Sequence, residues 1–240
     1  MKYNSLIIIP TYNEAENIEA VIKKVIDLED KNDILVIDDN SPDGTSKIVE
    51  NQKNIYNNRV FLIKREKKSG LGSAYKAGFK WALKNNYSYI FEMDADMSHD
   101  PNEIKNLKIQ LSQNKYDVVV GSRYINGVSV VNWPLSRIFL SYFANLYVRI
   151  ITGMPIKDAT SGFVGYTKNA LNSIELSKIK FNGYAFQIEM KFKLWKKKFK
   201  LKEHQIIFVN RKLGKSKMNQ SIIFEAIFGV IKLKINSFFK

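Results

Sequence analysis

The first two thirds of the chain alternates short apolar runs with segments whose apolar residues recur every three or four positions. The apolar runs predict buried strands at residues 5–10, 34–38, 60–64, 89–93 and 117–121. Helices are predicted between them, with starts near Ile18, Pro42, Leu71 and Pro101. Such alternation is typical of a mostly parallel, Rossmann-like sheet flanked by helices, so we predict an α/β fold class.

Polar residues collect directly behind three of these strands. They are Tyr12 and Glu14, then Asp38 and Asp39, then Asp94 and Asp96. In open α/β sheets, ligands bind at the carboxyl ends of the strands. The pattern therefore predicts a binding site at this edge of the sheet.

The segment FEMDADMSHDP, residues 91–101, divides into two parts. Asp100, Pro101 and the following Glu103 fit a helix start, with a cap, a first-turn proline and a capping-box glutamate. Asp94 and Asp96 lie too early for that role and, two apart in extended chain, point to the same side. Two neighbouring like charges there predict a bound cation.

The second strand end, IDDNSPDGT at residues 37–45, has a similar composition. Ser41 and Pro42 fit a cap and a first helical position, which leaves Asp38 and Asp39 without a structural role. We expect one of the pair to face solvent and the other to accept hydrogen bonds from a nucleobase or a ribose.

Composition narrows the choice of ligand. A formal charge of +15 favours anionic partners, which include nucleic acid, membrane surfaces and phosphorylated ligands. The chain has no cysteine and only His99 and His204, without paired-histidine spacing, so a hard, oxygen-bound cation is favoured over zinc. The glycines of SGLGSAYKAG, residues 69–78, do not complete a dinucleotide-binding motif, and no P-loop motif is present.

The last third loses the alternation. Residues 133–153 are apolar nearly all round a helix, which fits either a buried helix or one at a membrane interface, and residues 220–240 repeat this pattern. The basic run at 191–202 fits a solvated helix face or a membrane-surface segment. No signal peptide and no spanning segment are expected.

Eight stretches, in order along almost the whole chain, resemble one enzyme family. They are IPTYNE (9–14), IDDNSPDGT (37–45), KKSGLGSAY (67–75), MDADMSHDP (93–101), GSRY (121–124), ATSGF (159–163), GYAFQIEM (183–190) and NRKLGKSK (210–217). Together they resemble the inverting glycosyltransferases of the A-type fold and of family 2, and more narrowly the dolichyl-phosphate (polyprenyl-phosphate) mannosyltransferases.

The resemblance implies a donor site. Its implied residues are Pro10, Tyr12, Glu14, Ile37 and Asp39 around the nucleotide, Asp94, Ala95 and Asp96 in a DxD segment, and Arg211 and Lys217 near the diphosphate. Asp94 and Asp96 are implied ligands of Mg2+ or Mn2+, with Ser98 at a position where some relatives place a further metal ligand.

The resemblance also implies an acceptor site. Arg123 matches an acceptor-loop arginine, and Arg137 and Ser141, four residues apart on one helical face, match positions that meet a lipid phosphate. Asp94, Asp96 and Arg123 are thereby the expected catalytic residues.

These roles imply transfer of mannose from GDP-mannose to dolichyl or polyprenyl phosphate, with inversion to a β-linked product. A catalytic domain is expected at residues 1–217 and an amphipathic segment, with possible membrane contact, at 218–240. The implied location is the cytoplasmic face of a membrane, as a peripheral protein, alone or with a membrane-anchoring subunit.

Two alternatives stay open. A related enzyme would use UDP-glucose and a polyprenyl phosphate, or would act on another lipid or a polysaccharide, because the residues do not reveal the base of the donor. A non-enzymatic basic protein that binds nucleic acid or membranes would explain the charge of +15. It would leave Glu14, Asp39, Asp94 and Asp96 unexplained, so nucleic acid is not an expected partner.

Overall fold

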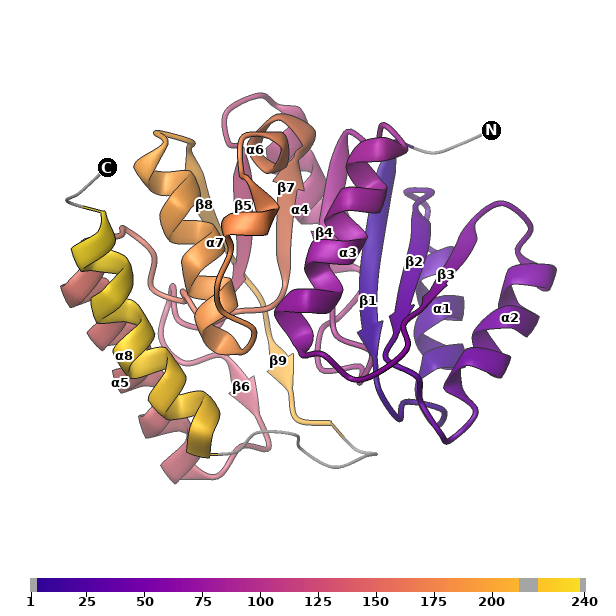
Figure 1. Ribbon diagram of the computed structural model, residues 1–240, viewed down its shortest axis with the longest axis horizontal. Coiled ribbons are helices and arrows are strands. Elements are labelled where there is room, and N and C mark those ends of the chain that lie inside the picture. Colours follow the sequence, from indigo (N-terminus) through magenta and orange to yellow (C-terminus); the bar gives the residue numbers. More distant parts are fainter. Residues whose placement is uncertain (1–3, 212–219, 238–240) are drawn as a thin grey trace.

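A seven-stranded sheet forms the centre of the protein (Figure 1). The computed structural model describes residues 4–211 and 220–237. The strand order is β3-β2-β1-β4-β7-β5-β8, and within the sheet β7 alone runs antiparallel to its neighbours. The strands are β1 (Ser5–Thr11), β2 (Asp33–Asp38), β3 (Val60–Lys64), β4 (Tyr89–Glu92), β5 (Val118–Ser122), β7 (Val164–Thr167) and β8 (Leu201–Gln205). A short parallel pair is formed by β6 (Val130–Val131) and β9 (Phe208–Val209). The predicted mostly parallel α/β sheet is confirmed.

Helices cover both faces of this sheet. They are α1 (Ile18–Ile26), α2 (Thr45–Ile55), α3 (Leu71–Lys84), α4 (Glu103–Ser112), α5 (Leu135–Thr152), α6 (Lys168–Asn172), α7 (Tyr184–Lys196) and α8 (Gln220–Asn236), with a 3-10 turn at Leu176–Lys178. Because strand side chains alternate, Ile8 packs with α3 and α7 on one face while Ile7 packs with α1 and α4 on the other. Gly78 of α3 lies so close to the sheet that a Cβ there would approach Ile8 to 2.7 Å.

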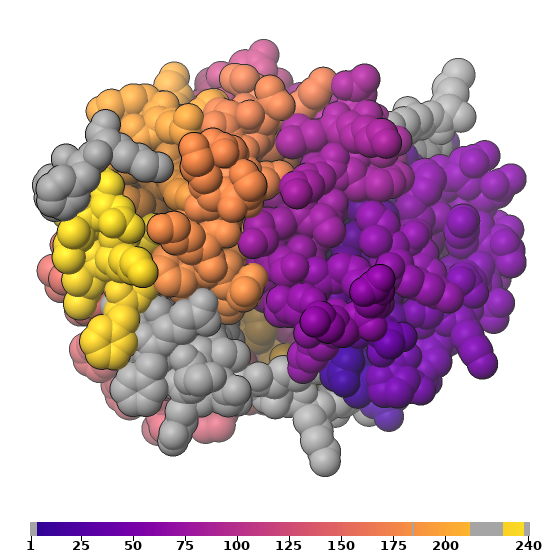
Figure 2. Space-filling model, viewed as in Figure 1, coloured from indigo at the N-terminus to yellow at the C-terminus, as the bar shows by residue number. Residues whose placement is uncertain are grey.

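A third apolar cluster lies at the end of the sheet beyond β8. It joins Val148 of α5, Ile188 and Phe192 of α7, and Val230 and Leu233 of α8. Figures 1 and 2 show α8 (yellow) beside α5 and α7, at the opposite end of the molecule from α2. Within residues 4–211 and 220–237, none of the helices combines the length and apolar character needed to cross a bilayer.

Two predicted helix starts are wrong by a few residues. Helix α2 begins at Thr45 because Gly44 adopts a left-handed conformation with φ 91°, and Ser41 does not cap it. Helix α4 begins at Glu103, after a turn in which the Asp100 carboxylate accepts the Asn102 N–H.

In the basic run at 191–202, Lys196, Lys197, Lys198, Lys200 and Lys202 are exposed, as a solvated face requires, but Lys191 is not. Lys191 is fully buried instead of solvated, and its Nζ donates to the carbonyls of Ala159, Ser161 and Gln187. Burial lowers the pKa of Lys191 to about 8. The lysine therefore ties α7 to the segment that precedes β7.

Candidate active site

The carboxyl ends of β1, β2 and β4 lie at one edge of the sheet because these three strands are parallel. The register places Pro10 opposite Ile37 and Thr11 opposite Asp38, so the ends of β1 and β2 are level. Pro10 is half-buried, Ile37 is fully buried within the core cluster, and Ala95 after β4 is also buried. All three residues thus lie at or next to the carboxyl ends of these strands.

Asp39 is held by a guanidinium at this edge. Its carboxylate accepts hydrogen bonds from Arg65 Nε at 2.6 Å, from Arg65 Nη2 at 2.7 Å and from the Ser69 N–H at 3.1 Å. Arg65 also donates to the Ser73 hydroxyl. The paired contacts fix the orientation of Asp39, and they tie it to the loop that precedes α3.

Asp38 is also buried, which corrects the expectation that one of the two aspartates faces solvent. Its carboxylate accepts from the hydroxyls of Thr11, Ser41 and Ser46. Burial raises the pKa of Asp38, but these hydrogen bonds outweigh it and hold the pKa below its usual value. Asp38 therefore has a structural role, and Asp39 is the carboxylate left for a ligand.

Tyr12 and Glu14 follow β1 toward the same loop. The ammonium of Lys68 lies 4.3 Å from the centre of the Tyr12 ring, a cation–π contact. Glu14 is buried, accepts from Asn17 Nδ2, and donates its backbone N–H to Thr45. Tyr12 and Asp39 thus belong to one cluster of aromatic, acidic and basic side chains.

Asp94 and Asp96 follow β4. The Asp96 carboxylate is buried, pairs with Arg211 Nη2 at 2.8 Å, and accepts from the N–H and hydroxyl of Ser98. Asp94 is more open, with 37% of its side chain exposed. Partial burial and the nearby charge of Asp96 raise the pKa of Asp94 to about 7. The two carboxylates are therefore close enough to repel each other.

His99, which had no expected role, supports this segment. Its ring stacks on Phe163 with centroids 4.9 Å apart, and it meets Phe208 edge-on at 5.3 Å. Its Nδ1 accepts the backbone N–H of Asp94. Burial lowers the pKa of His99 to about 4, so the ring is neutral at neutral pH.

Arg123 lies beyond the end of β5 and is almost fully buried. Its Nε and Nη2 donate to the two carboxylate oxygens of Asp158, each at 2.7 Å, and its backbone N–H donates to the same carboxylate. Burial raises the pKa of Asp158, but the Arg123 guanidinium more than offsets it and holds that pKa below its usual value. Asp158 was not among the predicted site residues, although it directly precedes the ATSGF stretch.

Arg137 and Ser141 lie on α5, near Arg123. The Arg137 guanidinium is 3.9 Å from the centre of the Trp133 ring, and Arg123 is 5.5 Å from the same ring. Ser141 accepts a hydrogen bond from the Tyr124 hydroxyl. The Trp133 indole nitrogen is buried and has no acceptor within residues 4–211 and 220–237. The Trp133 ring thus contacts both arginines. The sequence did not indicate this role.

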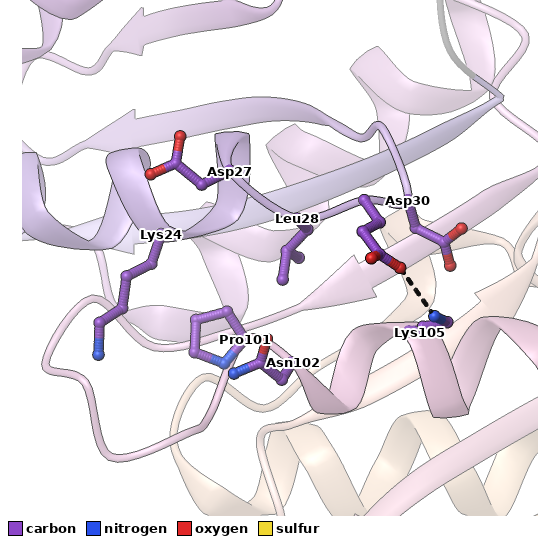
Figure 3. Close-up of a pocket in the computed structure, with 8 residues that line it drawn as sticks. Lys24, Asp27, Leu28, Asp30, Pro101, Asn102 and Lys105 are labelled. Carbon is purple, nitrogen blue, oxygen red and sulfur yellow. Dashed lines mark hydrogen bonds and ion pairs between the residues drawn. The ribbon is translucent and has the colours of Figure 1, made fainter.

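Lys217 lies outside the residues that the structure describes. Arg65, Lys68 and Asp158 were missed because their partners are distant in sequence. Trp133 was missed although its partner Arg137 is only four residues away. A cavity of about 430 Å³ lies elsewhere, between the end of α1 and the start of α4 (Figure 3). It is lined by charged residues, among them Lys24, Asp27 and Asp30, and by a Lys105–Glu29 ion pair. None of the predicted site residues lines it.

Residues 6–175 match the family described as glycosyl transferase family 2, which is more than half of the chain. The chain belongs to this family. It is therefore a glycosyltransferase.

Curated relatives of this glycosyltransferase cover almost its whole length. It is 42% identical over 226 residues to a polyprenol monophosphomannose synthase of Mycolicibacterium smegmatis, a match that spans 94% of the chain and 85% of the relative. It is 39% identical to an undecaprenyl-phosphate mannosyltransferase of Micrococcus luteus, over 95% of the chain and 92% of the relative. A dolichol-phosphate mannosyltransferase of Pyrococcus furiosus is 36% identical over 95% of the chain, which spans 62% of that relative. The family identified from the sequence stretches is confirmed.

Solved structures agree on the fold. A glucosyl-3-phosphoglycerate synthase from Mycobacterium tuberculosis, in complex with Mn2+, uridine-diphosphate and phosphoglyceric acid, superposes with a TM-score of 0.70 at 15% sequence identity. The match covers 97% of this chain and 78% of the other. The glycosyltransferase A-type fold is thereby confirmed.

The arrangement also fits a divalent cation, judged by its donor set. Asp94 and Asp96 offer carboxylate oxygens, and burial together with the charge of Asp96 raises the pKa of Asp94, a condition that a bound cation would relieve. Within the described parts of the chain there is no cluster of three or more His, Asp or Glu side chains that could hold a metal. Mg2+ is commonly held by one or two carboxylates together with substrate phosphates, so two carboxylates suffice.

Proposed function

We propose that this glycosyltransferase transfers mannose from GDP-mannose to a polyprenyl phosphate, at the cytoplasmic face of a membrane. One observation carries the choice of substrates. The three relatives described above are all named for polyprenol, undecaprenyl or dolichol phosphate mannose chemistry, at 36–42% identity over 94–95% of the chain. The site geometry supports each half of the reaction.

The edge formed by β1, β2 and β4 supports donor binding. Asp39, oriented by Arg65, can accept hydrogen bonds from the base or ribose, beside the Tyr12 ring. Asp94 and Asp96 would hold Mg2+ or Mn2+, with Ser98 adjacent through its hydrogen bonds to Asp96. The ion would neutralise charge on the donor diphosphate. The Asp96–Arg211 ion pair places a further positive charge, the Arg211 guanidinium, beside Asp96.

The side formed by Arg123, Arg137 and Ser141 supports binding of the acceptor phosphate. Arginines are well suited to this role because their planar donor groups match phosphate oxygens. One oxygen of the acceptor phosphate attacks the anomeric carbon, while the bond from that carbon to the diphosphate breaks and GDP leaves with the electron pair. The acceptor is already ionised, so no strong base is needed. A single in-line displacement inverts the configuration and gives a β-linked product.

Exposed apolar residues on α5 and α8 support contact with a membrane. Phe139 and Phe143 on α5 are 59% and 58% exposed, and Phe228 on α8 is 68% exposed. Arg149 and Lys232 are exposed on the same two helices, where they can meet lipid phosphates. Because α5 also carries Arg137 and Ser141, the phosphate of a membrane lipid would arrive next to Arg123.

The proposal is tested by incubating the purified protein with Mn2+, a short polyprenyl phosphate in detergent, and either GDP-mannose or UDP-glucose. We expect a lipid-linked mannose from GDP-mannose, no product with a chelator, and β configuration by NMR. Turnover with UDP-glucose alone would contradict the mannose assignment and favour the glucosyltransferase alternative. Vesicle binding by the protein without added subunits would separately test whether a membrane-anchoring partner is required.

A further inference from the structure

The hydroxyl of Thr160 lies at the junction between Arg123 and α5. Its oxygen accepts from Arg123 Nη2 at 2.9 Å and from Asn145 Nδ2 at 3.1 Å, and its proton is donated to Asp158 at 3.3 Å. A hydroxyl can donate once and accept twice, so all its hydrogen-bonding capacity is used here. Such complete use is expected of a group that sets the positions of its neighbours.

Asn145 of α5 forms hydrogen bonds with both the side chain and the backbone of Thr160. It is buried, and its Oδ1 accepts the backbone N–H of Thr160 at 3.1 Å while its Nδ2 also donates to the Ser141 carbonyl. Ser141 and Arg137 belong to the same helix. Thr160 therefore links Arg123 to the helix that carries the other two acceptor residues.

The segment around Thr160 is fixed from the opposite side as well. The backbone N–H groups of Lys157 and Asp158 both donate to Glu203 of β8, and buried Lys191 donates to the carbonyls of Ala159 and Ser161. The segment thus has few ways to move independently of the sheet. These hydrogen bonds hold the segment in place between β5, α5 and β8.

We infer that Asp158 and Thr160 are positioning residues, which hold the Arg123 guanidinium at a fixed place relative to Arg137 and Ser141 on α5. The three acceptor residues then bind the phosphate of the lipid as one preorganised unit. This inference rests on the acceptor role given to Arg123 and α5 in the proposed function. It adds that the affinity for the acceptor depends on residues that do not touch it.

A fixed orientation of Arg123 lowers the free-energy cost of binding the phosphate. A free arginine side chain has many rotamers, and ordering it during binding costs free energy that is avoided if the protein has already fixed it. Two guanidinium groups near one anion also repel each other before the anion arrives. The Asp158 carboxylate offsets the charge of Arg123, while Thr160 fixes its outer nitrogen without adding charge.

The test compares Thr160→Val with Thr160→Ser. Valine keeps the shape but removes the hydroxyl to which Arg123 Nη2 donates, whereas serine keeps that hydroxyl. Thr152→Val is the matched control, because Thr152 is a buried threonine of α5 whose hydroxyl bonds to the Val148 carbonyl and the Met154 N–H, away from Arg123. The dissociation constant of a short polyprenyl phosphate is measured by calorimetry, and KM for each substrate by initial rates.

We expect Thr160→Val to weaken polyprenyl phosphate binding about threefold to tenfold, the equivalent of one hydrogen bond, without changing KM for the sugar nucleotide. Thr160→Ser should restore wild-type acceptor binding, and Thr152→Val should leave it unchanged. Unaltered acceptor binding in Thr160→Val, or equal weakening in Thr152→Val, would overturn the inference. If polyprenyl phosphate binds in a Thr160-dependent way but GDP-mannose gives no product, the proposed function fails while this inference stands.

Discussion

At the carboxyl ends of β1, β2 and β4, the site presents carboxylates whose partners come from nearby loops, as Arg65 does for Asp39 and Arg211 for Asp96. On the other side, beyond β5, the site presents the guanidinium groups of Arg123 and Arg137, placed beside a tryptophan ring and a buried aspartate. The first region is thus suited to a metal-bound diphosphate and a nucleoside. The second is suited to a bare phosphate.

This difference shows how one small site can bring two anions together. Two phosphates repel each other, so each needs its own counter-charge before they can react. In this chain a cation held by carboxylates would serve one phosphate, and arginines held by the protein would serve the other. His99 contacts both regions, because its ring accepts the Asp94 N–H and meets Phe208, whose ring centre lies 5.7 Å from the Arg123 guanidinium.

The largest expected effect is loss of the carboxylates on the donor side. Asp94→Ala or Asp96→Ala should lower the rate of sugar transfer by about a thousandfold, because the charge on the leaving diphosphate would lose its main stabilisation. Initial rates at saturating Mn2+ measure this. Asp100→Ala, in the exposed turn before α4, is the control and should keep its activity. Normal transfer by either site variant would remove the proposed metal role.

A buried ion pair on the acceptor side should matter more for stability than any pair at the surface. Asp158→Ala leaves Arg123 buried without its carboxylate and should lower the free energy of unfolding by about 3 kcal/mol. Glu50→Ala breaks the exposed Lys64–Glu50 pair, which water screens, and should have a much smaller effect on the free energy of unfolding. Denaturant unfolding of both variants measures these losses. Similar losses in free energy of unfolding would mean that the buried Arg123–Asp158 pair contributes no more to stability than an exposed pair.

The apolar face of α5 provides a third test. Phe139→Glu combined with Phe143→Glu should weaken binding to anionic lipid vesicles about tenfold or more, since two exposed aromatic side chains that would enter the lipid surface are replaced by charges. Ile55→Glu is the matched control, because Ile55 is an exposed apolar residue of α2 at the far end of the molecule. Vesicle sedimentation measures the effect. Because the site variant adds two negative charges and the control adds one, a loss of binding free energy only twice that of the control would indicate binding by net charge alone.

The smallest effect concerns His99 and pH. Its pKa is lowered to about 4 in the folded protein, so below its ordinary value of 6.5 the unfolded chain takes up a proton that the folded chain does not. The stabilisation of wild type relative to His99→Phe should therefore fall by about 2 kcal/mol between about pH 7.5 and about pH 5. Glu92 and Asp94, whose pKa values burial raises to about 8 and about 7, titrate in both proteins, so the comparison of wild type with His99→Phe is needed to remove their contribution. A difference independent of pH would contradict the buried, neutral ring.

The strands on the donor side could be predicted because their apolar runs are buried on both faces, as Leu6 to Ile9 are. Asp94, Asp96 and Asp39 followed from their places behind these strands. Helix starts were less predictable, since the left-handed conformation of Gly44 overrides the signals from Ser41 and Pro42. Local sequence does not determine such a backbone choice.

The acceptor side was less predictable because its contacts join distant residues. Strand β7 inserts antiparallel between β4 and β5, and no local pattern reveals this pairing. The partner of Arg123 is 35 residues away at Asp158. On the donor side too, the place of Asp39 could be predicted but its partner could not, because Arg65 is 26 residues away. Lys191 looked like a surface lysine in a basic run, yet backbone carbonyls from another segment satisfy it in the core.

The most direct test of the two-region account is a comparison of substrate KM values in Asp39→Asn and Arg137→Met. Asp39→Asn should raise KM for GDP-mannose and leave KM for polyprenyl phosphate unchanged, because it alters only the nucleoside end of the donor side. Arg137→Met should do the reverse. If each variant changed both KM values equally, or if Arg137→Met raised KM for the donor alone, the assignment of the two regions to two substrates would be wrong.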